Sequence, residues 1–254
     1  MKIVRFKDNN NETNYGWIHQ EKIGLIQGDP FGEFRRFEAT LLLDDITLLL
    51  PCLPGKIIAV GRNYRDHARE MDSEVPAYPL IFLKPPSSLI TNGEPIVLPR
   101  QSKHVEHEAE LAIVIGKRSR DLNPSQVNEA IFGYTIANDI TARDLQRQDQ
   151  QWTRAKGFDS FCPLGPWIET DFDPSDALIS CHVNNALRQM GSTKDMVFKP
   201  EQLVIFISSI MTLETGDVIL TGTPSGVGPL KPGDIVNVHI DGLGTLVNPV
   251  VQAD

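Results

Sequence analysis

His107-Glu-Ala-Glu-Leu-Ala-Ile-Val-Ile-Gly116 is the stretch from which we derive both the fold and the chemistry of this chain. Residues 111–115 form an apolar run with the β-branched content of a buried strand. Glu108 and Glu110 lie two positions apart at the mouth of that strand, so their side chains point to the same face. Buried carboxylates that close repel each other, and a divalent cation between them removes the repulsion. Oxygen ligands favour Mg²⁺, Mn²⁺ or Ca²⁺ over zinc.

The two-residue spacing alone leaves two questions open. Glu106 has the same parity as Glu108 and Glu110, so parity does not say which of the three carboxylates bind a cation. A solvated strand end is also a more frequent explanation of a lone Glu-x-Glu than a metal site. Other segments of the sequence are needed to choose between a metal site and a solvated strand end, and to say which glutamates would bind the metal.

Composition places the chain among ordinary globular proteins. The 254 residues are 41% hydrophobic and 22% charged, which suits one large domain or a main domain with a small appendage. The formal net charge of −9 argues against a nucleic-acid or anionic-membrane partner, because those partners select basic surfaces. An anionic substrate would therefore need local Lys, Arg or metal to enter.

Cysteine usage and apolar patterning predict a cytoplasmic protein. The three cysteines, Cys52, Cys162 and Cys181, show neither zinc spacing nor a disulfide framework. Residues 1–6 carry charge where a signal peptide would have an apolar core. The longest apolar stretch, residues 203–213, is too short and too polar to span a bilayer.

The first part of the chain predicts a small β-rich unit. Residues 2–6 suit a strand, and residues 15–28 suit a strand pair that turns at Gln20 and Glu21. Residues 51–55 hold two prolines and a glycine and mark a boundary. We therefore predict an N-terminal domain over 1–55 and a catalytic domain over 56–254.

Candidate catalytic side chains follow the next predicted strand, residues 56–60. A glycine at its end leads to Arg62, a position from which polar side chains are often presented to a site. His67 and Glu70 then lie three residues apart, so they face each other on a helical turn. A carboxylate beside an imidazole orients the ring and raises its basicity. The alternative is a surface ion pair on a short helix.

A third carboxylate follows the acidic strand. Asn123 and Pro124 predict a helix that Gly133 ends, and residues 134–137 predict a strand that delivers Asp139. Asp139 is a candidate metal ligand, or alternatively the cap of a helix over residues 140–145.

Further candidate pocket residues come from three more segments. Arg143 and Gln146 share a helix face at a spacing of three. Lys156, in an irregular segment, is placed to meet a substrate carboxylate or an enolate, whereas Lys84 fits either a pocket cation or a surface charge. The glycine-rich loop at 222–228 lacks the lysine of a phosphate-binding loop, but the Thr223 hydroxyl and backbone N–H groups there suit a carboxylate.

Two local patterns predict structure rather than chemistry. Asn184 and Asn185 separate two strand-like runs and indicate a hairpin turn. Leu203, Phe206 and Ile207 begin a helical apolar stripe that is typical of a core helix.

Taken together, these segments resemble the fumarylacetoacetate hydrolase superfamily from residue 56 to residue 251. Each motif alone is weak, and their order and spacing make the resemblance specific. The motifs are Val-Gly-Arg-Asn-Tyr at 60–64, Phe-Leu-Lys-Pro-Pro at 82–86, His-Glu-Ala-Glu-Leu at 107–111, Asn-Asp-Ile-Thr-Ala-Arg-Asp at 138–144, Ala-Lys-Gly-Phe-Asp at 155–159 and Thr-Gly-Thr-Pro-Ser-Gly-Val at 221–227.

The resemblance implies an α+β, β-rich fold: a mixed β-sheet roll with a few short helices, beside the small N-terminal appendage. It implies a metal site, and a homodimer as the usual assembly. The ligands would be Glu108, Glu110 and Asp139, with Mg²⁺ or Mn²⁺ as the expected cation and Ca²⁺ as a further option.

The resemblance also assigns roles to the remaining candidates. His67 and Glu70 would form a water-activating dyad on a mobile lid segment, and Lys156 would join them in catalysis. The expected substrate contacts are Arg62, Arg143, Gln146 and Thr223. Asn185, where the family usually has a glycine, touches only a turn.

The expected activity is metal-dependent cleavage of a C–C bond in a small 2-oxo or β-diketo acid, by hydrolysis of an acylpyruvate-like substrate or decarboxylation of an oxaloacetate-like one. An isomerase or decarboxylase of the 2-hydroxyhepta-2,4-diene-1,7-dioate type and a ureidoglycolate-type lyase are alternatives within the family. A non-catalytic β domain with a structural Ca²⁺ is the alternative from another class.

Overall fold

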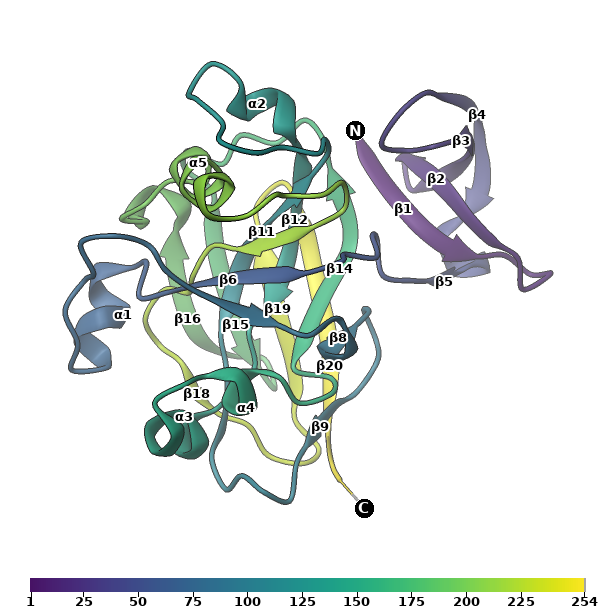
Figure 1. Ribbon diagram of the computed structural model, residues 1–254. Helices are drawn as coiled ribbons and strands as arrows, with labels where there is room; N and C mark the ends of the chain where they lie inside the picture. Colours follow the sequence, from purple (N-terminus) through teal and green to yellow (C-terminus); the bar gives the residue numbers. More distant parts are fainter. Residues whose placement is uncertain (254) are drawn as a thin grey trace.

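The largest β-sheet of the protein is mixed and has twelve strands. The computed structural model describes it together with the other elements over residues 1–253 (Figure 1). Its strands run in the order β4-β3-β2-β1-β14-β12-β11-β17-β6-β7, and β5 and β8 pair with β1 and β14. The strands of this sheet that come after residue 55 are β6 (Ile57–Gly61), β7 (Leu80–Lys84), β8 (Leu89–Ile90), β11 (Ala109–Ile115), β12 (Ile131–Asn138), β14 (Cys162–Glu169) and β17 (Val218–Leu220).

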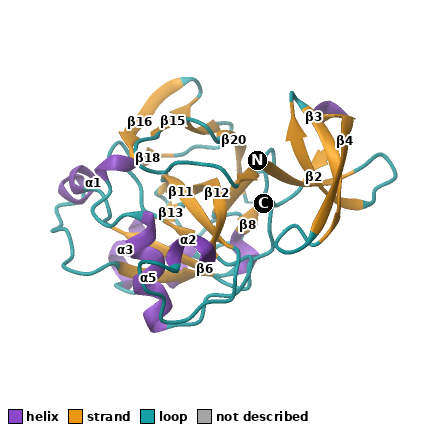
Figure 2. Ribbon diagram, turned by 90° about the horizontal axis from the view of Figure 1, so that it is seen from above, coloured by secondary structure: helices purple, strands orange, loops and turns teal. Residues whose placement is uncertain are grey.

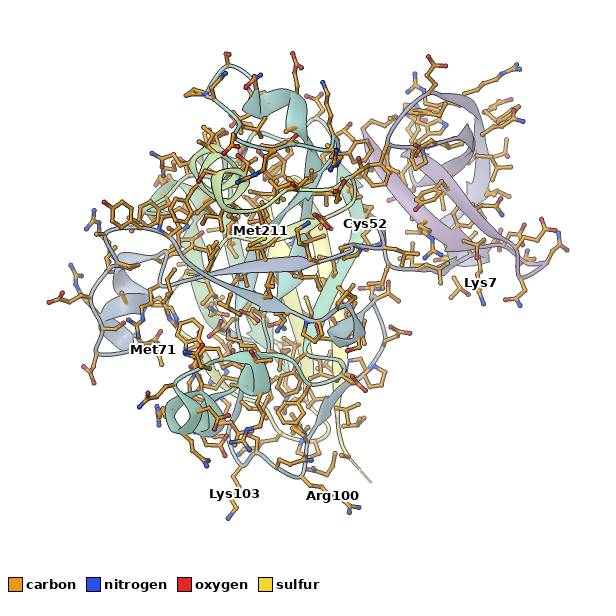
Figure 3. The ribbon with its side chains drawn as sticks, in the orientation of Figure 1. Lys7, Cys52, Met71, Arg100, Lys103 and Met211 are labelled. Atoms are coloured by element: carbon orange, nitrogen blue, oxygen red, sulfur yellow. The ribbon has the colours of Figure 1, made fainter. Side chains whose placement is uncertain are left out.

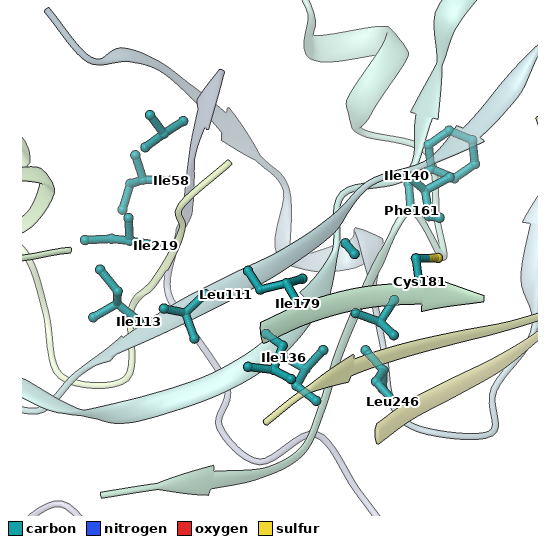
Figure 4. Packing of buried hydrophobic residues seen from close by; sticks show 14 of the residues in the cluster. Ile58, Leu111, Ile113, Ile136, Ile140, Phe161, Ile179, Cys181, Ile219 and Leu246 are labelled. Atoms are coloured by element: carbon teal, nitrogen blue, oxygen red, sulfur yellow. The ribbon is translucent and has the colours of Figure 1, made fainter. Parts of the chain in front are cut away.

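A second sheet packs against the first and closes the core. It runs β16-β15-β19-β20-β9, with bounds Ala186–Ser192, Leu178–Val183, Ile235–Ile240, Gly244–Gln252 and Ile96–Leu98. Figure 4 shows Leu111 and Ile136 of the first sheet facing Ile179 and Leu246 of the second. All four side chains are buried, so the alternating faces of the two sheets form one continuous apolar interior.

The predicted strand at the acidic motif is confirmed as β11, a strand in the interior of the molecule. Every residue of β11 is buried, and antiparallel pairing with β12 on one side and β17 on the other leaves it no open edge. A side chain at the entrance of such a strand is held rigidly, because both neighbouring strands fix its backbone.

Helices are short and lie around the sheets. They are α1 (Arg65–Glu70), α2 (Val127–Ala130), α3 (Arg143–Asp149), α4 (Thr153–Lys156) and α5 (Pro200–Ile210), with 3₁₀ turns at Leu43–Asp45, Pro86–Ser88 and Thr193–Asp195. Within residues 1–253, none of the helices has the length and apolar character needed to cross a membrane. A small third sheet joins β13 (Thr141–Ala142), β10 (Val105–His107) and β18 (Gly228–Pro229).

Two expectations about helices were wrong. The helix predicted to run from Asn123 to Gly133 is only α2, because residues from Ile131 onward pair with β11 instead. The alternative that made Asp139 the cap of a helix over residues 140–145 is also wrong, because that helix begins at Arg143, after the short strand β13. Asp139 is therefore not a helix cap, and its carboxylate is free for other contacts.

The N-terminal strands form a separate layer beside the main body (Figures 1 and 2). They are β1 (Lys2–Lys7), β2 (Thr13–His19), β3 (Lys22–Gly28), β4 (Phe34–Leu42) and β5 (Thr47–Leu48). The strand pair predicted for residues 15–28 is confirmed as β2 and β3. Among residues 1–253, β1 is the one strand of this layer that pairs with the body's sheet, at the end of β14. The boundary between residues 55 and 56 stays a prediction.

Candidate metal and substrate site

Three carboxylates from two paired strands converge at one end of the main sheet. Ala109 pairs with Asn138 across β11 and β12, so Asp139, at the end of β12, falls beside Glu108. The Asp139 N–H donates to the Glu108 carbonyl at 2.8 Å, and the Asn138 side chain accepts from the Glu108 N–H at 2.9 Å. Carboxylate oxygens of Glu108, Glu110 and Asp139 all lie within 4.8 Å of one another.

Two buried lysines neutralise part of this negative charge. Lys156 Nζ lies 2.7 Å from Glu108 Oε2 and 2.6 Å from Asp139 Oδ2, so it spans two of the three carboxylates. Lys84 Nζ donates to Asp139 Oδ1 at 2.7 Å and to the Lys156 carbonyl at 2.6 Å. Lys84 is thus a buried member of the site and not a surface charge.

Arg143 forms hydrogen-bonded ion pairs with Glu106 and Glu108. Its Nε donates to Glu106 Oε2 at 2.7 Å, and its Nη2 donates to Glu108 Oε1 at 2.6 Å. Its Nη1 donates to Gln146 Oε1 at 2.6 Å, which confirms that the two side chains share a helix face. Glu106 points to Arg143 and to His104, outside the carboxylate trio. The structure therefore separates Glu106 from the two glutamates that share its parity.

Electrostatics distinguish the two glutamates of the trio. Burial by itself raises the pKa of Glu108, but the Lys156 and Arg143 charges outweigh it and hold that pKa below its ordinary value. Burial and the neighbouring Asp139 and Glu108 charges raise the pKa of Glu110 well above its ordinary value. Within the described residues 1–253, Glu110 is the carboxylate of the trio that forms no ion pair with a lysine or arginine.

The donor set fits a hard divalent cation. Among residues 1–253, the backbone N–H of Gly222, at 2.6 Å, is the one hydrogen-bond donor recorded to the Glu110 carboxylate. Glu110 also lines an open cavity, so its other oxygen faces space that a ligand can enter. Three buried carboxylates with one of them uncompensated are the chemistry that Mg²⁺ or Mn²⁺ binds in proteins.

The predicted dyad forms on α1. His67 Nδ1 lies 3.0 Å from Glu70 Oε2, and His67 is buried at the cavity wall. The Gly226 N–H donates to both Glu70 oxygens, at 3.0 and 3.2 Å. The glycine-rich loop thus holds Glu70, and Glu70 in turn orients the imidazole.

The cavity at this site has a volume of about 400 Å³. The structure brings together around it every site residue predicted from the sequence: Arg62, His67, Glu70, Glu108, Glu110, Asp139, Arg143, Gln146, Lys156 and Thr223. Thr223 Oγ1 donates to the Ala109 carbonyl at 2.9 Å and accepts from Gln189 Nε2 at 2.7 Å, so its hydroxyl is already engaged.

Several residues of the site received no individual role from the sequence, although Trp152 begins an irregular segment of a kind that often forms site walls. Phe82 and Trp152 form an aromatic wall, with ring centroids 5.1 Å apart in an edge-on arrangement. Arg147, four residues after Arg143, also lines the cavity, and that helical spacing was a readable signal. Gln189 reaches the site from β16 and had no such signal, because only the packing of the second sheet brings it there.

Thiol chemistry is not part of this site. Cys52, Cys162 and Cys181 are all buried, and burial raises the pKa of each thiol to about 12. None of the three lines the cavity. A thiolate nucleophile is therefore not available to a substrate here.

Two curated relatives share most of their length with this chain. The mitochondrial oxaloacetate decarboxylase of Dictyostelium discoideum is 47% identical over 197 residues, which cover 75% of this chain and 90% of that protein. The mitochondrial oxaloacetate tautomerase Fahd2a of Rattus norvegicus is 44% identical over 218 residues, which cover 81% of this chain and 70% of that protein.

Solved structures match over the whole chain. The 5-carboxymethyl-2-hydroxymuconate delta-isomerase from Mycobacterium smegmatis superposes with a TM-score of 0.93 at 44% identity, covering 100% of both chains. The maleylpyruvate hydrolase from Sphingobium sp. SYK-6, solved with manganese(II) and pyruvate, superposes with a TM-score of 0.82 at 31% identity, again covering 100% of both.

Family assignments divide the chain in two. Residues 1–51 match a family described as Rv2993c-like, N-terminal. Residues 56–251 match the family described as Fumarylacetoacetate (FAA) hydrolase C-terminal. The acidic strand, the dyad and the lysine of the cavity all lie within this second range. The chain therefore belongs to the fumarylacetoacetate hydrolase family of enzymes.

Proposed function

We propose that this chain is a divalent-metal-dependent enzyme that forms an enolate from a small 2-oxo acid. The observation that carries the proposal is the convergence of Glu108, Glu110 and Asp139 within 4.8 Å at the wall of a cavity. When bound there, Mg²⁺ or Mn²⁺ polarises a keto oxygen and stabilises the negative charge that develops on it. Ca²⁺ would fit the same oxygen ligands.

The protein's own residues prepare that cation site and the space beside it. Arg143 and Lys156 hold Glu108 ionised and pointed at the cavity. The Lys156 ammonium, 2.6 Å from Asp139, also places positive charge at the cavity wall, where it opposes the charge of an enolate. The aromatic wall of Phe82 and Trp152 excludes water from one side and so strengthens these interactions.

The dyad favours hydrolysis of an acylpyruvate-like acid. His67 faces the cavity, and Glu70 holds its Nδ1, which leaves Nε2 to accept a proton from water. When that water attacks the carbonyl at C4, its oxygen bonds to C4 and the C3–C4 bond breaks. The products are a carboxylic acid from the acyl group and the enolate of the shortened 2-oxo acid. The maleylpyruvate hydrolase that shares this fold supports the reaction class.

Decarboxylation or tautomerisation of an oxaloacetate-like acid is the second candidate. The relatives named for oxaloacetate are 47% and 44% identical to this chain. Loss of CO₂ leaves the enolate of the shortened acid, whereas keto–enol transfer passes through the enolate of the intact acid. Both enolates carry their charge on the keto oxygen, and neither reaction needs an attacking water. The isomerase with the same fold supports the proton-transfer variant of this chemistry.

Metal titration tests the cation site independently of turnover. Calorimetry with Mn²⁺ and Mg²⁺ should show one site per chain, and Glu110→Gln should weaken binding by about 100-fold or more because a carboxylate ligand is lost. Glu129→Gln, at an exposed carboxylate outside the cavity, is the matched control and should bind like the parent. Equal affinity in all three proteins would reject the site.

Substrate comparison then separates the two reactions. Acetylpyruvate, fumarylpyruvate and oxaloacetate are assayed with the parent and with His67→Ala in Mn²⁺. Hydrolysis through the dyad predicts loss of activity on the two diketo acids in the variant, by about 100-fold or more. Oxaloacetate decarboxylation should survive. An equal loss on all three acids would give His67 a role other than water activation.

Two features that the sequence predicts belong with this proposal. The homodimer is expected from the family resemblance, and native mass spectrometry measures it directly. The cytoplasmic location is expected from the cysteine pattern, and fractionation of the source cells tests it.

A further inference from the structure

Two of the arginines that line the cavity form no ion pair with the site's carboxylates within the described residues. Arg143 and Lys156 both have carboxylate partners at 2.7 Å or less. Arg62 and Arg147 line the same cavity, yet the structure records no ion pair or side-chain hydrogen bond for either within residues 1–253. Two arginines that line one cavity and have no recorded partner within residues 1–253 favour an anion there, because guanidinium groups pair with carboxylates.

Arg62 is held in place by its neighbours. Its backbone φ is 59°, in the left-handed region that non-glycine residues seldom adopt. Asn63, which follows, is fully buried and bonds to the Phe198 and Thr221 carbonyls at 2.9 and 2.8 Å. These contacts fix the loop after β6, so the unusual conformation at Arg62 persists at the cavity wall.

Arg147 approaches from a different element. It lies one helical turn after Arg143 on α3, and therefore on the same side of that helix. Arg143 is 2% exposed and turns inward to the glutamates, whereas Arg147 is exposed at the cavity. The helix thus offers one arginine to the metal side of the site and one to its open side.

The acids near the two arginines leave them with excess positive charge. Outside the trio, the acidic side chains that line the cavity are Glu70 and Asp72. Glu70 is engaged by His67 and the Gly226 N–H, and Asp72 makes no ion pair within the described residues. One free acid against two free guanidinium groups leaves room for one more negative charge.

We infer that Arg62 and Arg147 bind a second carboxylate, at the end of the substrate remote from its 2-oxo acid group. The enzyme then selects 2-oxo dicarboxylic acids over the corresponding monocarboxylic acids. This inference rests on the proposed function, because it needs the 2-oxo acid group to sit at the metal trio. The Phe82 and Trp152 rings would pack against the chain between the two carboxylates, and a cavity of about 400 Å³ suits a molecule of that size.

The experiment measures binding of a matched pair of unreactive acids. 2-Oxoglutarate and 2-oxopentanoate differ by a carboxylate in place of a methyl group, and neither carries a 4-keto group or a carboxyl group β to the ketone. Their dissociation constants are measured by calorimetry on the Mn²⁺-loaded protein. The parent should bind 2-oxoglutarate about tenfold or more tightly than 2-oxopentanoate.

Variants assign that preference to the two arginines. Arg62→Gln and Arg147→Gln should each lower the ratio of the two dissociation constants, and the double variant should bring it close to one. Arg147→Lys, which keeps the charge, should retain part of the ratio. Arg100→Gln removes an exposed arginine that Figure 3 places well away from Met71 at the cavity, and it should leave the ratio unchanged.

The outcomes distinguish this inference from the proposed function. If 2-oxopentanoate binds with Mn²⁺ but the parent shows no preference for the diacid, or if the double variant keeps the preference, the inference is wrong and the proposed function stands. If the protein binds Mn²⁺ but neither acid, the proposed function is rejected and the inference falls with it.

Discussion

Asn63 connects the loop that presents Arg62 to two other segments of the site. Its side-chain amide donates to the Phe198 and Thr221 carbonyls, and its oxygen accepts from the Phe198 N–H at 2.8 Å. Gly222 packs so closely that a Cβ there would lie 2.8 Å from the Asn63 Cβ. One buried amide thus holds the strand end, the glycine-rich loop and the segment before α5 together.

Replacing that amide by a carboxylate should be strongly destabilising. Asn63→Asp keeps the shape but removes both donors and sets a buried negative charge against two carbonyl oxygens. We expect a loss of about 3 kcal/mol or more in the free energy of unfolding. Urea denaturation measures it, with Asn10→Asp at an exposed turn as the control. A variant as stable as the control would show that these hydrogen bonds contribute little.

Single residues of the site were predictable where a motif carried their chemistry. Residue type and spacing offered the carboxylate trio, the dyad and Lys156 as candidates, and the family resemblance chose them over Glu106 and over surface roles. The structure places all of them at one cavity. Lys84 stayed ambiguous, because whether a lysine after a strand is buried depends on what packs over it. Here Asp139 and the Lys156 carbonyl, both distant in sequence, accept from it.

At the scale of elements, the hairpin between β15 and β16 places two asparagines at turn positions that require positive φ. The predicted turn is confirmed, and Asn184 and Asn185 both have positive φ, 51° and 64°. This pair of values is the type I′ turn whose twist matches the flanking strands. The second position of such a turn favours glycine, which adopts positive φ without a steric penalty.

Asn185→Gly should therefore stabilise the protein slightly. Relief of the left-handed strain outweighs the added freedom of the unfolded chain, and we expect a gain of about 0.5 kcal/mol. Asn185→Ala, which tolerates positive φ less well than asparagine, should lose about 1 kcal/mol. Chemical denaturation of the three proteins tests the order. An alanine variant more stable than the glycine variant would contradict it.

The helices were less predictable than the strands because long-range pairing competes with local signals. Asn123 carries a cap signal, and its side chain does accept from the Ser125 N–H at 3.0 Å, but in a turn before α2. Pairing of Ile131 with Ile115 then continues the chain as a strand. Likewise Asp139, a favoured cap residue, is held by Lys84 and Lys156, and the helix begins later. Neither partner is visible in the local sequence.

At the scale of the whole molecule, the N-terminal layer depends on the body for its stability. Its own core has three fully buried side chains, Val4, Phe6 and Ile23. About fifty residues with so small a core are marginal on their own. Strand β1 pairs with β14 through Ile3 and Ile168, and Trp167 of β14 packs against the small core. The layer and the body share a sheet, although family assignments treat them as separate.

This shared sheet predicts that the chain unfolds in a single transition. Scanning calorimetry should give one peak. Under the proposed function Mn²⁺ binds at the body's carboxylates, so it should move the whole peak upward because it stabilises only the folded state. Val4→Ala, in the small core, should cost about 2 kcal/mol and lower that same peak by about 4 to 8 °C. If the N-terminal layer were independent, two peaks would appear: Mn²⁺ would shift one and Val4→Ala the other. Such a result would mean that the β1–β14 pairing does not couple the two parts.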